Sequence, residues 1–166
     1  MSREDPTLVV TPVETGRFVG GAASVAAHAG GLGAASRLHS VVGQDDQAEF
    51  LREQLSGWGV RHSLVVDAGR PTTTKQRFRA SGKTLLRVSH LRQDSISEEI
   101  QHRITSEVCS DMEDHDLLIF SDFNYGVLTQ TLVQTVTQRS RDAGLLLAAD
   151  SQTSSQVGDV SRFVGR

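Results

Sequence analysis

Three stretches of the chain carry polar groups that could bind a ligand, and the first of them is rich in glycine. Gly20 and Gly21 stand just before a run of small residues that includes Ser24. Glycine lets the backbone approach a ligand closely, and the free N–H groups at the start of a helix can donate hydrogen bonds to hydroxyl or phosphate oxygens. A tight turn without a ligand is the alternative interpretation of the same glycine pair.

The other two stretches each place a carboxylate at the end of a short apolar strand. Asp122, with Asn124 behind it, follows the apolar residues 117–120, and Asp150 follows residues 145–149. Ligands of open parallel sheets gather at the carboxyl ends of the strands, so either carboxylate could accept hydrogen bonds from ligand hydroxyls. Either carboxylate could equally cap the helix that comes next.

Other patterns that would indicate catalysis or metal binding are incomplete. Residues 82–84 read Gly-Lys-Thr, like the end of a phosphate-binding P-loop, but the first glycine of that motif would fall at Arg77. The six histidines show no paired zinc-ligand spacing, and the single Cys109 allows no internal disulfide. The sequence also has no Gly-x-Ser-x-Gly elbow. We therefore expect neither a metal site nor a hydrolase triad.

Composition and charge narrow the classes of partner. Among 166 residues, 17 Lys and Arg stand against 20 Asp and Glu, and these charges are spread along the chain. Such a distribution argues against a nucleic-acid or membrane-surface partner. No stretch approaches the roughly 20 apolar residues of a membrane span, and residues 1–10 lack the features of a signal peptide. Because there is also only one cysteine, we expect a cytoplasmic protein.

Strand and helix patterns alternate along most of the chain. Helices are predicted over residues 20–28, 45–57, 97–108 and 129–141, and strands over residues 37–42, 60–66, 117–120 and 145–149. Elements of these lengths are typical of βαβ units and predict an α/β fold with a mainly parallel sheet flanked by helices. The last two strands are so apolar that we expect them to be buried on both faces.

Two further regions have the composition of strands without intervening helices. Residues 8–13 predict an edge strand, because Pro12 cannot donate to a sheet ladder. Residues 72–80 and 84–89 flank Ser81-Gly82, a turn signal that predicts a β-hairpin.

Several motifs occur in an order that is specific to one family. Residues 19–26 contain Gly-Gly followed by Ser24, residues 42–46 read Val-Gly-Gln-Asp-Asp, residues 71–77 read Pro-Thr-Thr-Thr-Lys-Gln-Arg, and residues 118–128 contain Ser-Asp-Phe-Asn-Tyr-Gly. Together they resemble the ribokinase (PfkB) carbohydrate-kinase family, and more narrowly the heptose 7-phosphate kinase domain of ADP-heptose biosynthesis. The resemblance implies one partial ribokinase-like domain over residues 1–166, with a small β lid at about residues 8–18 and 70–90.

The resemblance also implies a substrate and a set of substrate-binding residues. These are Gly20, Gly21, Ser24, Lys75, Arg87, Asp122 and Asp150. A cationic side chain, Lys75 or Arg87, would suit the phosphate that the sugar already carries, although both could instead lie on a solvated strand face. The chain departs from the family pattern at Ser24, which replaces an asparagine, at Tyr125, which replaces a lysine, and at Ser151-Gln152, which replaces Pro-Lys.

The family's catalytic aspartate lies in a C-terminal Gly-Ala-Gly-Asp loop that we do not find here, since Gly158-Asp159 has other neighbours. The family's N-terminal strand is likewise not found before Pro6. We therefore expect a chain truncated at both ends relative to the family, without a catalytic residue. The full-length family uses ATP and Mg²⁺, and we expect this chain to hold neither tightly.

Two functional hypotheses follow. The chain is either part of a sugar-phosphate kinase that is inactive alone, or a non-catalytic sugar-binding or assembly module. In both cases the resemblance implies a homodimer formed through the lid strands.

Overall fold

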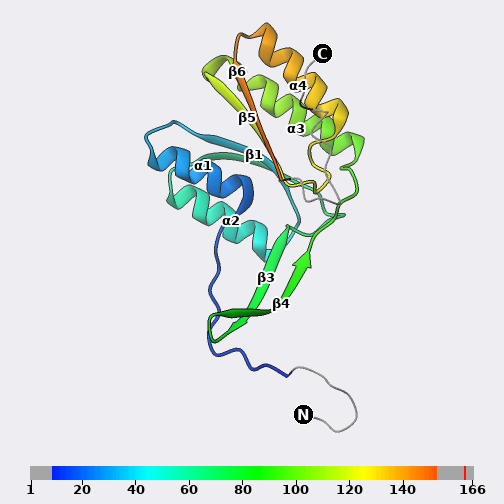
Figure 1. Ribbon diagram of the computed structural model, residues 1–166. Coiled ribbons are helices and arrows are strands. Elements are labelled where there is room, and N and C mark those ends of the chain that lie inside the picture. Colours follow the sequence, from blue (N-terminus) through cyan, green and yellow to red (C-terminus); the bar gives the residue numbers. More distant parts are fainter. Residues whose placement is uncertain (1–8, 153–162, 164–166) are drawn as a thin grey trace.

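The computed structural model describes residues 9–152 and residue 163. In this part of the chain the helices are α1 (Gly21–Gly31), α2 (Asp46–Gly57), α3 (Glu98–Ser110) and α4 (Gln130–Asp142), with a short 3-10 helix η1 (Met112–Asp114). The strands are β1 (Arg37–Val42), β2 (Arg61–Val66), β3 (Thr74–Ala80), β4 (Lys83–His90), β5 (Leu117–Asp122) and β6 (Leu146–Ser151). All the helices and strands predicted for residues 20–149 are confirmed, with ends that shift by a few residues (Figure 1).

The core strands form two parallel pairs. β1 pairs with β2, with Arg37 opposite Arg61, and β5 pairs with β6, with Leu117 opposite Leu146. A helix links the strands of each pair, α2 in the first and α4 in the second, as the alternating pattern predicts. We expected one mainly parallel sheet, but the two pairs are not joined, because no described strand is hydrogen-bonded between them.

Apolar helix faces pack on these strands in two clusters. One cluster joins α3 and α4 to the strands and includes the buried side chains of Ile104, Val133, Val136 and Phe120. The other joins α1 and α2 to β1 and includes Leu55, which is fully buried, together with Ala23, Leu38 and Val60. The four-residue spacing of apolar positions in α3 and the inward face predicted for α4 are therefore confirmed.

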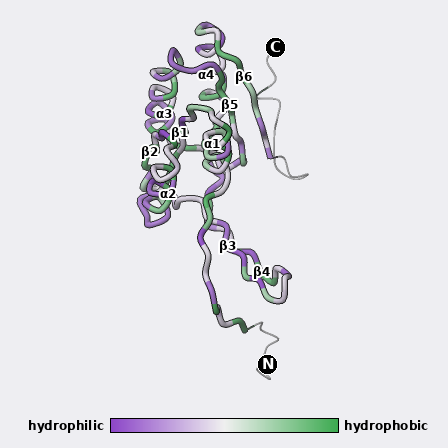
Figure 2. The backbone as a smooth tube through the Cα atoms, turned by 90° about the vertical axis from the view of Figure 1, so that its left-hand side faces the viewer, coloured by the Kyte–Doolittle hydropathy of each residue, from purple (hydrophilic) through white to green (hydrophobic). Residues whose placement is uncertain are grey.

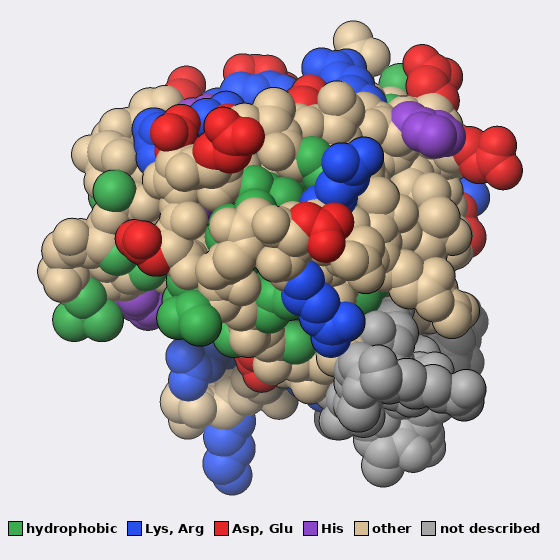
Figure 3. Space-filling view, turned by 90° about the horizontal axis from the view of Figure 1, so that it is seen from above, with side chains coloured by type: hydrophobic (Ala, Val, Ile, Leu, Met, Phe, Trp, Pro, Cys, Tyr) green, Lys and Arg blue, Asp and Glu red, His purple; other side chains and the backbone are tan. Residues whose placement is uncertain are grey.

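The prediction that the last two apolar strands are buried on both faces is wrong. Leu117 and Ile119 of β5 are each 47% exposed, and Leu146 of β6 is 69% exposed. Alternate side chains point to opposite faces of a strand, and only the face with Leu118 and Phe120 packs against the cluster of α3 and α4. Figure 3 shows hydrophobic side chains at the surface of the molecule when it is seen from above.

The predicted hairpin is confirmed and forms a lid that projects away from the helices and core strands (Figure 2). β3 and β4 pair in antiparallel fashion, with Arg77 directly opposite Arg87. The turn between them has a positive φ at both Ser81 and Gly82, which are 49° and 75°. Positive φ at both central residues gives the turn the twist that suits a two-residue hairpin.

The first lid strand, expected at residues 8–18, is not formed over residues 9–18, and Leu8 lies outside the described residues. The backbone there has no strand partner, and Val9 and Val13 are 82% and 98% exposed. A lone extended segment gains no ladder hydrogen bonds, so it has no reason to become a strand. A cation–π contact attaches its end to α2, because the Arg17 guanidinium lies 5.6 Å from the ring centroid of Phe50.

Side-chain caps fix where three of the helices begin. Asp45 accepts a hydrogen bond from the backbone N–H of Ala48, Ser97 accepts one from Ile100, and Thr129 accepts one from Leu132. Each cap satisfies a backbone donor that the helix itself cannot pair. None of the described helices has the length and apolar content that crossing a membrane requires.

Candidate functional site

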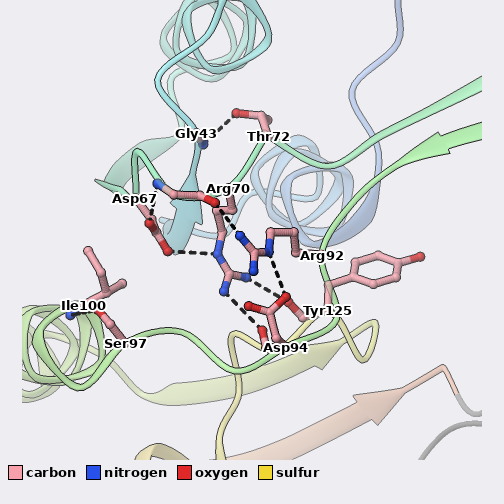
Figure 4. Close-up of polar contacts among 10 residues, drawn as sticks. Gly43, Asp67, Arg70, Thr72, Arg92, Asp94, Ser97, Ile100 and Tyr125 are labelled. Carbon is pink, nitrogen blue, oxygen red and sulfur yellow. Dashed lines mark hydrogen bonds and ion pairs between the residues drawn. The ribbon is translucent and has the colours of Figure 1, made fainter.

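The lid is held to the core by a buried guanidinium. Arg70, in the loop between β2 and β3, is only 9% exposed, and its Nε donates to Asp67 Oδ2 over 2.9 Å. Its two terminal nitrogens donate to the backbone oxygens of Tyr125 and Asp94, each over 3.1 Å (Figure 4). A planar fork of donors suits such a set of fixed acceptors. One side chain therefore joins both lid connections to the loop after β5.

A second guanidinium closes the same junction from the exposed side. Arg92 Nε donates to Asp94 Oδ1 over 2.8 Å, and its Nη1 donates to the backbone oxygen of Gly69 over 2.7 Å. The hydrogen bond and charge of Arg92 hold the pKa of the Asp94 carboxyl below its ordinary value. Because these groups are exposed, the main effect of the pair is to fix the geometry of the two lid connections.

A third tether joins the lid to the start of α2. Asp45 Oδ2 accepts a hydrogen bond of 2.8 Å from the backbone N–H of Thr72, and Thr72 Oγ1 accepts one of 2.9 Å from Gly43. Burial raises the pKa of Asp45, but the hydrogen bonds from Thr72 and Ala48 outweigh burial and leave the pKa below its ordinary value. Gly43 has no room for a side chain, since an added Cβ would lie 2.6 Å from the Arg70 oxygen.

Between the lid and the loop after β5 lies a cavity of about 430 Å³. Its lining includes the cations Lys75, Arg77 and Arg87, the amides Gln76 and Gln93, and Tyr125. In the part of the chain that the structure describes, neither Asp nor Glu lines this cavity. The cavity therefore has a local excess of positive charge although the whole sequence has a net charge of -3.

The positions of the two arginines make the cavity a suitable site for an anion. Arg77 and Arg87 are direct cross-strand partners, and Lys75 lies two residues before Arg77, on the same face of β3. Like charges directly opposite one another destabilise a strand pair. A phosphate between them would remove this repulsion and accept charge-assisted hydrogen bonds.

Tyr125 is the aromatic residue of the cavity lining, and Phe123 supports it without lining the cavity. The Lys75 ammonium lies 5.2 Å from the ring centroid of Tyr125, and the ring of Phe123 stacks on Tyr125 with centroids 6.4 Å apart. Phe123 in turn lies against Gly21, where an added Cβ would be 3.5 Å from the ring. This series of contacts links the lid, the loop after β5 and the start of α1.

The predicted ligand groups at the start of α1 do not line the cavity, and Phe123 connects them to Tyr125 on its wall. Gly20 precedes the helix in an extended conformation with no side-chain cap, and Gly21 has a φ of 60°. An added Cβ on Gly20 would meet nothing within 4 Å. The first N–H groups of α1 are therefore available to an incoming ligand. Ser24 lies partly buried in the first turn of the same helix.

Asp122 ends β5 and does not line the cavity, and its carboxylate already has partners. It is 4% exposed, its Oδ1 accepts from the backbone N–H of Asn124 over 2.9 Å, and its Oδ2 accepts from Ser151 Oγ over 2.8 Å. The alternative that Asp122 caps the next helix is wrong, because Thr129 caps α4. Asp122 instead shapes the turn after β5 and joins it to β6. Its role in binding a substrate stays a prediction.

Asp150 points away from Asp122. Asp150 pairs with Ser121, whereas Asp122 pairs with Ser151 at the next position of the sheet. Because neighbouring positions of a strand point to opposite faces, the two carboxylates lie on opposite faces of the β5–β6 sheet. Asp150 is exposed and lies inside β6, so it does not cap a described helix. The structure thus separates two carboxylates that the sequence led us to treat alike.

Sequence reasoning missed three residues that matter for the geometry of the site. Arg77 belongs to the same motif as Lys75, and its strand spacing could have placed it beside Lys75. Tyr125 was noted only as a departure from the family pattern. Arg70 gave no sequence signal, because two of its three acceptors are backbone oxygens far along the chain.

The described residues show no group of three or more His, Cys, Asp or Glu side chains that could hold a metal ion. Cys109 packs partly buried against the core of α3 and α4, and burial raises the pKa of its thiol. A thiol in this setting is a packing residue.

Comparison with known proteins gives a consistent result. The family described as pfkB family carbohydrate kinase matches residues 2–163. The Bifunctional protein HldE of Gluconobacter oxydans is 32% identical over 152 residues, which cover 90% of this chain and 32% of that protein. The chain thus spans about a third of the length of the curated relatives it matches.

Two solved structures resemble the fold. Escherichia coli phosphofructokinase-2 in complex with fructose-6-phosphate has a TM-score of 0.60 at 16% identity, over 82% of this chain and 44% of that chain. A carbohydrate kinase from Agrobacterium tumefaciens has a TM-score of 0.62 at 17% identity, over 86% of this chain and 47% of that chain. The expected ribokinase-like α/β fold is confirmed.

The Arg70→Lys substitution should weaken the lid junction, because lysine keeps the charge but cannot reach three fixed acceptors at once. We expect the free energy of unfolding to fall by about 1–3 kcal/mol. Amide hydrogen exchange should also rise in the two lid connections. The matched control is Arg141→Lys at an exposed position of α4, which should change stability by less than about 0.5 kcal/mol. Equal stability and exchange in the two variants would contradict the role of Arg70.

Asp45 should make stability depend on pH. Its pKa is lowered in the folded chain, so its stabilisation is present above the ordinary carboxyl pKa and is lost as the pH falls through the folded value. Asp45→Asn keeps a good helix cap but cannot ionise. In urea unfolding at pH 6, 4 and 3, the wild type should lose its advantage over Asp45→Asn as the pH falls. A difference that does not change with pH would show that the charge of Asp45 plays no part.

Proposed function

Because this chain belongs to the pfkB family of carbohydrate kinases, we propose that it supplies the sugar-phosphate recognition part of a sugar kinase. The observation that carries the proposal is the cavity beneath the lid, which three cations line without a described carboxylate. An anionic ligand is what such a cavity would stabilise.

The phosphate of the sugar binds to the lid in this proposal. Lys75 and Arg87 provide the first contacts, as expected from the family resemblance, and Arg77 adds a third cation between them. A guanidinium can bind two phosphate oxygens at once, whereas an ammonium acts as a point charge. The substrate is a phosphorylated sugar such as D-glycero-D-manno-heptose 7-phosphate, which the likeness of residues 71–77 to the heptose kinase motif supports.

The sugar itself lies toward the start of α1. Gly20 and Gly21 expose N–H groups there, and Ser24 adds a hydroxyl in the first turn. The turn after β5 is next to this region, since the Phe123 ring lies against Gly21. Asp122 would contribute through its hold on that turn. Asp150 lies on the other face of the sheet, so it would require a different approach of the substrate.

In a kinase of this family, ATP with Mg²⁺ supplies the phosphoryl group and a base accepts the proton of the attacking hydroxyl. The described residues do not fit a magnesium site, and no described Asp or Glu lines the cavity. The residues of this chain therefore bind and orient the sugar phosphate, which supplies the positional part of catalysis. That the chain alone does not turn over ATP stays a prediction, as do its cytoplasmic setting and its failure to bind ATP and Mg²⁺ tightly.

A non-catalytic sugar-binding or assembly module is the second candidate. Both oxygens of the Asp122 carboxylate accept hydrogen bonds within the chain, and Tyr125 stands where the family pattern has lysine. Both features are compatible with binding without turnover. A coupled assay for ATP consumption with heptose 7-phosphate separates the two functions, because only the kinase is expected to be active in a longer form of the protein.

Removing the lid cations should weaken the binding of a phosphorylated sugar. We expect Lys75→Ala and Arg87→Ala each to raise the dissociation constant for fructose 6-phosphate by about 10-fold or more, because a charge-assisted hydrogen bond contributes about 1.5–3 kcal/mol. Lys83→Ala, at the tip of the same hairpin but not part of the cavity lining, is the matched control. NMR titration of amide shifts measures the dissociation constant of the wild type and of the three variants. Equal affinities for Lys75→Ala, Arg87→Ala and Lys83→Ala would refute the phosphate site.

The lid should also join two copies of the chain. β3 and β4 form a two-stranded sheet, and Leu85 and Leu86 are exposed on it, as are Val9 and Val13 in the segment before α1. Exposed strand edges of this kind pair readily between chains. Sedimentation velocity at micromolar concentration should show a dimer, and Leu86→Asp should shift it toward monomer. A single monomer peak for the wild type would count against the dimer.

A further inference from the structure

Tyr125 is held in place by the backbone on both sides. Its own carbonyl accepts a hydrogen bond from Arg70 over 3.1 Å, and the carbonyl of the next residue, Gly126, accepts one from Ile96 over 3.0 Å. Gly126 has a φ of 75°, and an added Cβ would lie 2.0 Å from the Asp94 oxygen. The loop therefore packs closely against residue 94 and is hydrogen-bonded on both sides of Tyr125, which fixes where its side chain starts.

The ring is also supported from behind. Phe123 stacks on it at an interplanar angle of 20°, and Phe123 itself rests against Gly21 at the start of α1. Tyr125 is partly buried, and the Lys75 ammonium of the lid lies over its ring. Figure 4 shows the Tyr125 side chain beside the Arg70 and Arg92 junction that fixes the lid. A ring fixed in this way is a rigid platform.

Lys75 meets this platform from the lid. Its ammonium lies 5.2 Å from the ring centroid, within the range in which the negative face of an aromatic ring attracts a cation. A lysine on an exposed strand otherwise samples many rotamers, and repulsion from Arg77 and Arg87 favours the rotamers that leave the cavity. The ring counters both tendencies and keeps the ammonium at the cavity wall.

We propose that Tyr125 is the positioning residue that makes this site select a phosphorylated sugar over the same sugar without phosphate. It does so by holding the Lys75 ammonium beside Arg77 and Arg87, where the phosphate would bind. The proposal rests on the proposed function of the cavity. Lysine at position 125, the residue in the related motif, would repel Lys75 and cannot act in this way.

The sequence allows the contact to be observed directly. It holds two lysines, Lys75 and Lys83, and one tyrosine. Reductive ¹³C-methylation of lysine keeps the positive charge and adds an NMR signal to each. The Lys75 methyl signal should be shifted upfield by the ring current of Tyr125, and Lys83→Arg assigns it. Tyr125→Phe should keep that shift, whereas Tyr125→Leu should abolish it without moving the Lys83 signal.

Selectivity is then measured by NMR titration with fructose 6-phosphate and with fructose. We expect Tyr125→Leu to weaken fructose 6-phosphate binding by about 3- to 10-fold, the range that a cation–π contact supplies. Fructose binding should not change, because fructose carries no phosphate. Tyr125→Phe should bind both sugars as the wild type does. Tyr125→Lys should abolish the ring-current shift of the Lys75 methyl signal.

The possible outcomes separate this inference from the proposed function. If Lys75→Ala weakens fructose 6-phosphate binding but Tyr125→Leu does not, the positioning role is overturned and the phosphate site stands. If Tyr125→Leu strengthens binding, the ring competes with phosphate for Lys75, and the proposal is equally overturned. If Lys75→Ala has no effect, the phosphate site itself is wrong, and the methyl signal still reports whether the contact with Tyr125 exists. A thermal unfolding curve for each variant shows that the comparison is between folded proteins.

Discussion

The buried guanidinium of Arg70 is the contact on which the geometry of the site depends. A two-stranded hairpin is at best marginally stable alone, and the lid projects from the body of the protein. Arg70 binds Asp67 on one lid connection, the Asp94 carbonyl on the other, and the Tyr125 carbonyl on the core. Removing a buried cation from water is costly, and here an acid and two carbonyls offset that cost. The lid and the floor of the cavity are therefore placed by the same side chain.

Once the lid is fixed, electrostatics decide what the cavity can hold. The lid places Arg77 and Arg87 opposite each other, with Lys75 nearby, although isolated cations would separate. The aromatic ring of Tyr125 faces one of these cations, and the carboxylate of Asp122 is turned into the loop by its own hydrogen bonds. Positive charge thus gathers on the lid, while the Asp122 carboxylate is directed to donors within the loop and β6. The phosphate of the proposed sugar substrate would bind at these lid cations.

The sequence predicted the elements well because the signals that set them are local. Caps such as Asp45, Ser97 and Thr129 and the Ser81-Gly82 hairpin turn act within a few residues. The exposure of Leu117, Ile119 and Leu146 could not be predicted, because burial depends on which layers cover a strand and not on the apolar character of the strand itself. The absence of a strand over residues 9–18 also depends on distant parts of the fold, since a strand needs a partner to pair with.

The candidate site was predicted in part, through the resemblance. Lys75 and Arg87 line one cavity, and Gly21 is linked to it only through Phe123, whereas Asp150 lies on the opposite face of its sheet from Asp122. Arg70 and Tyr125 act through backbone carbonyls and ring faces, which leave no pattern in a single sequence.

The most direct test of the central claim is a crystal structure of the chain with fructose 6-phosphate. The account predicts the phosphate in the cavity, within hydrogen-bonding distance of Lys75 and Arg87, and the sugar toward Gly20 and Gly21. Sugar phosphate bound elsewhere with the lid cations unoccupied, for example on the exposed face of β5 and β6, would contradict it.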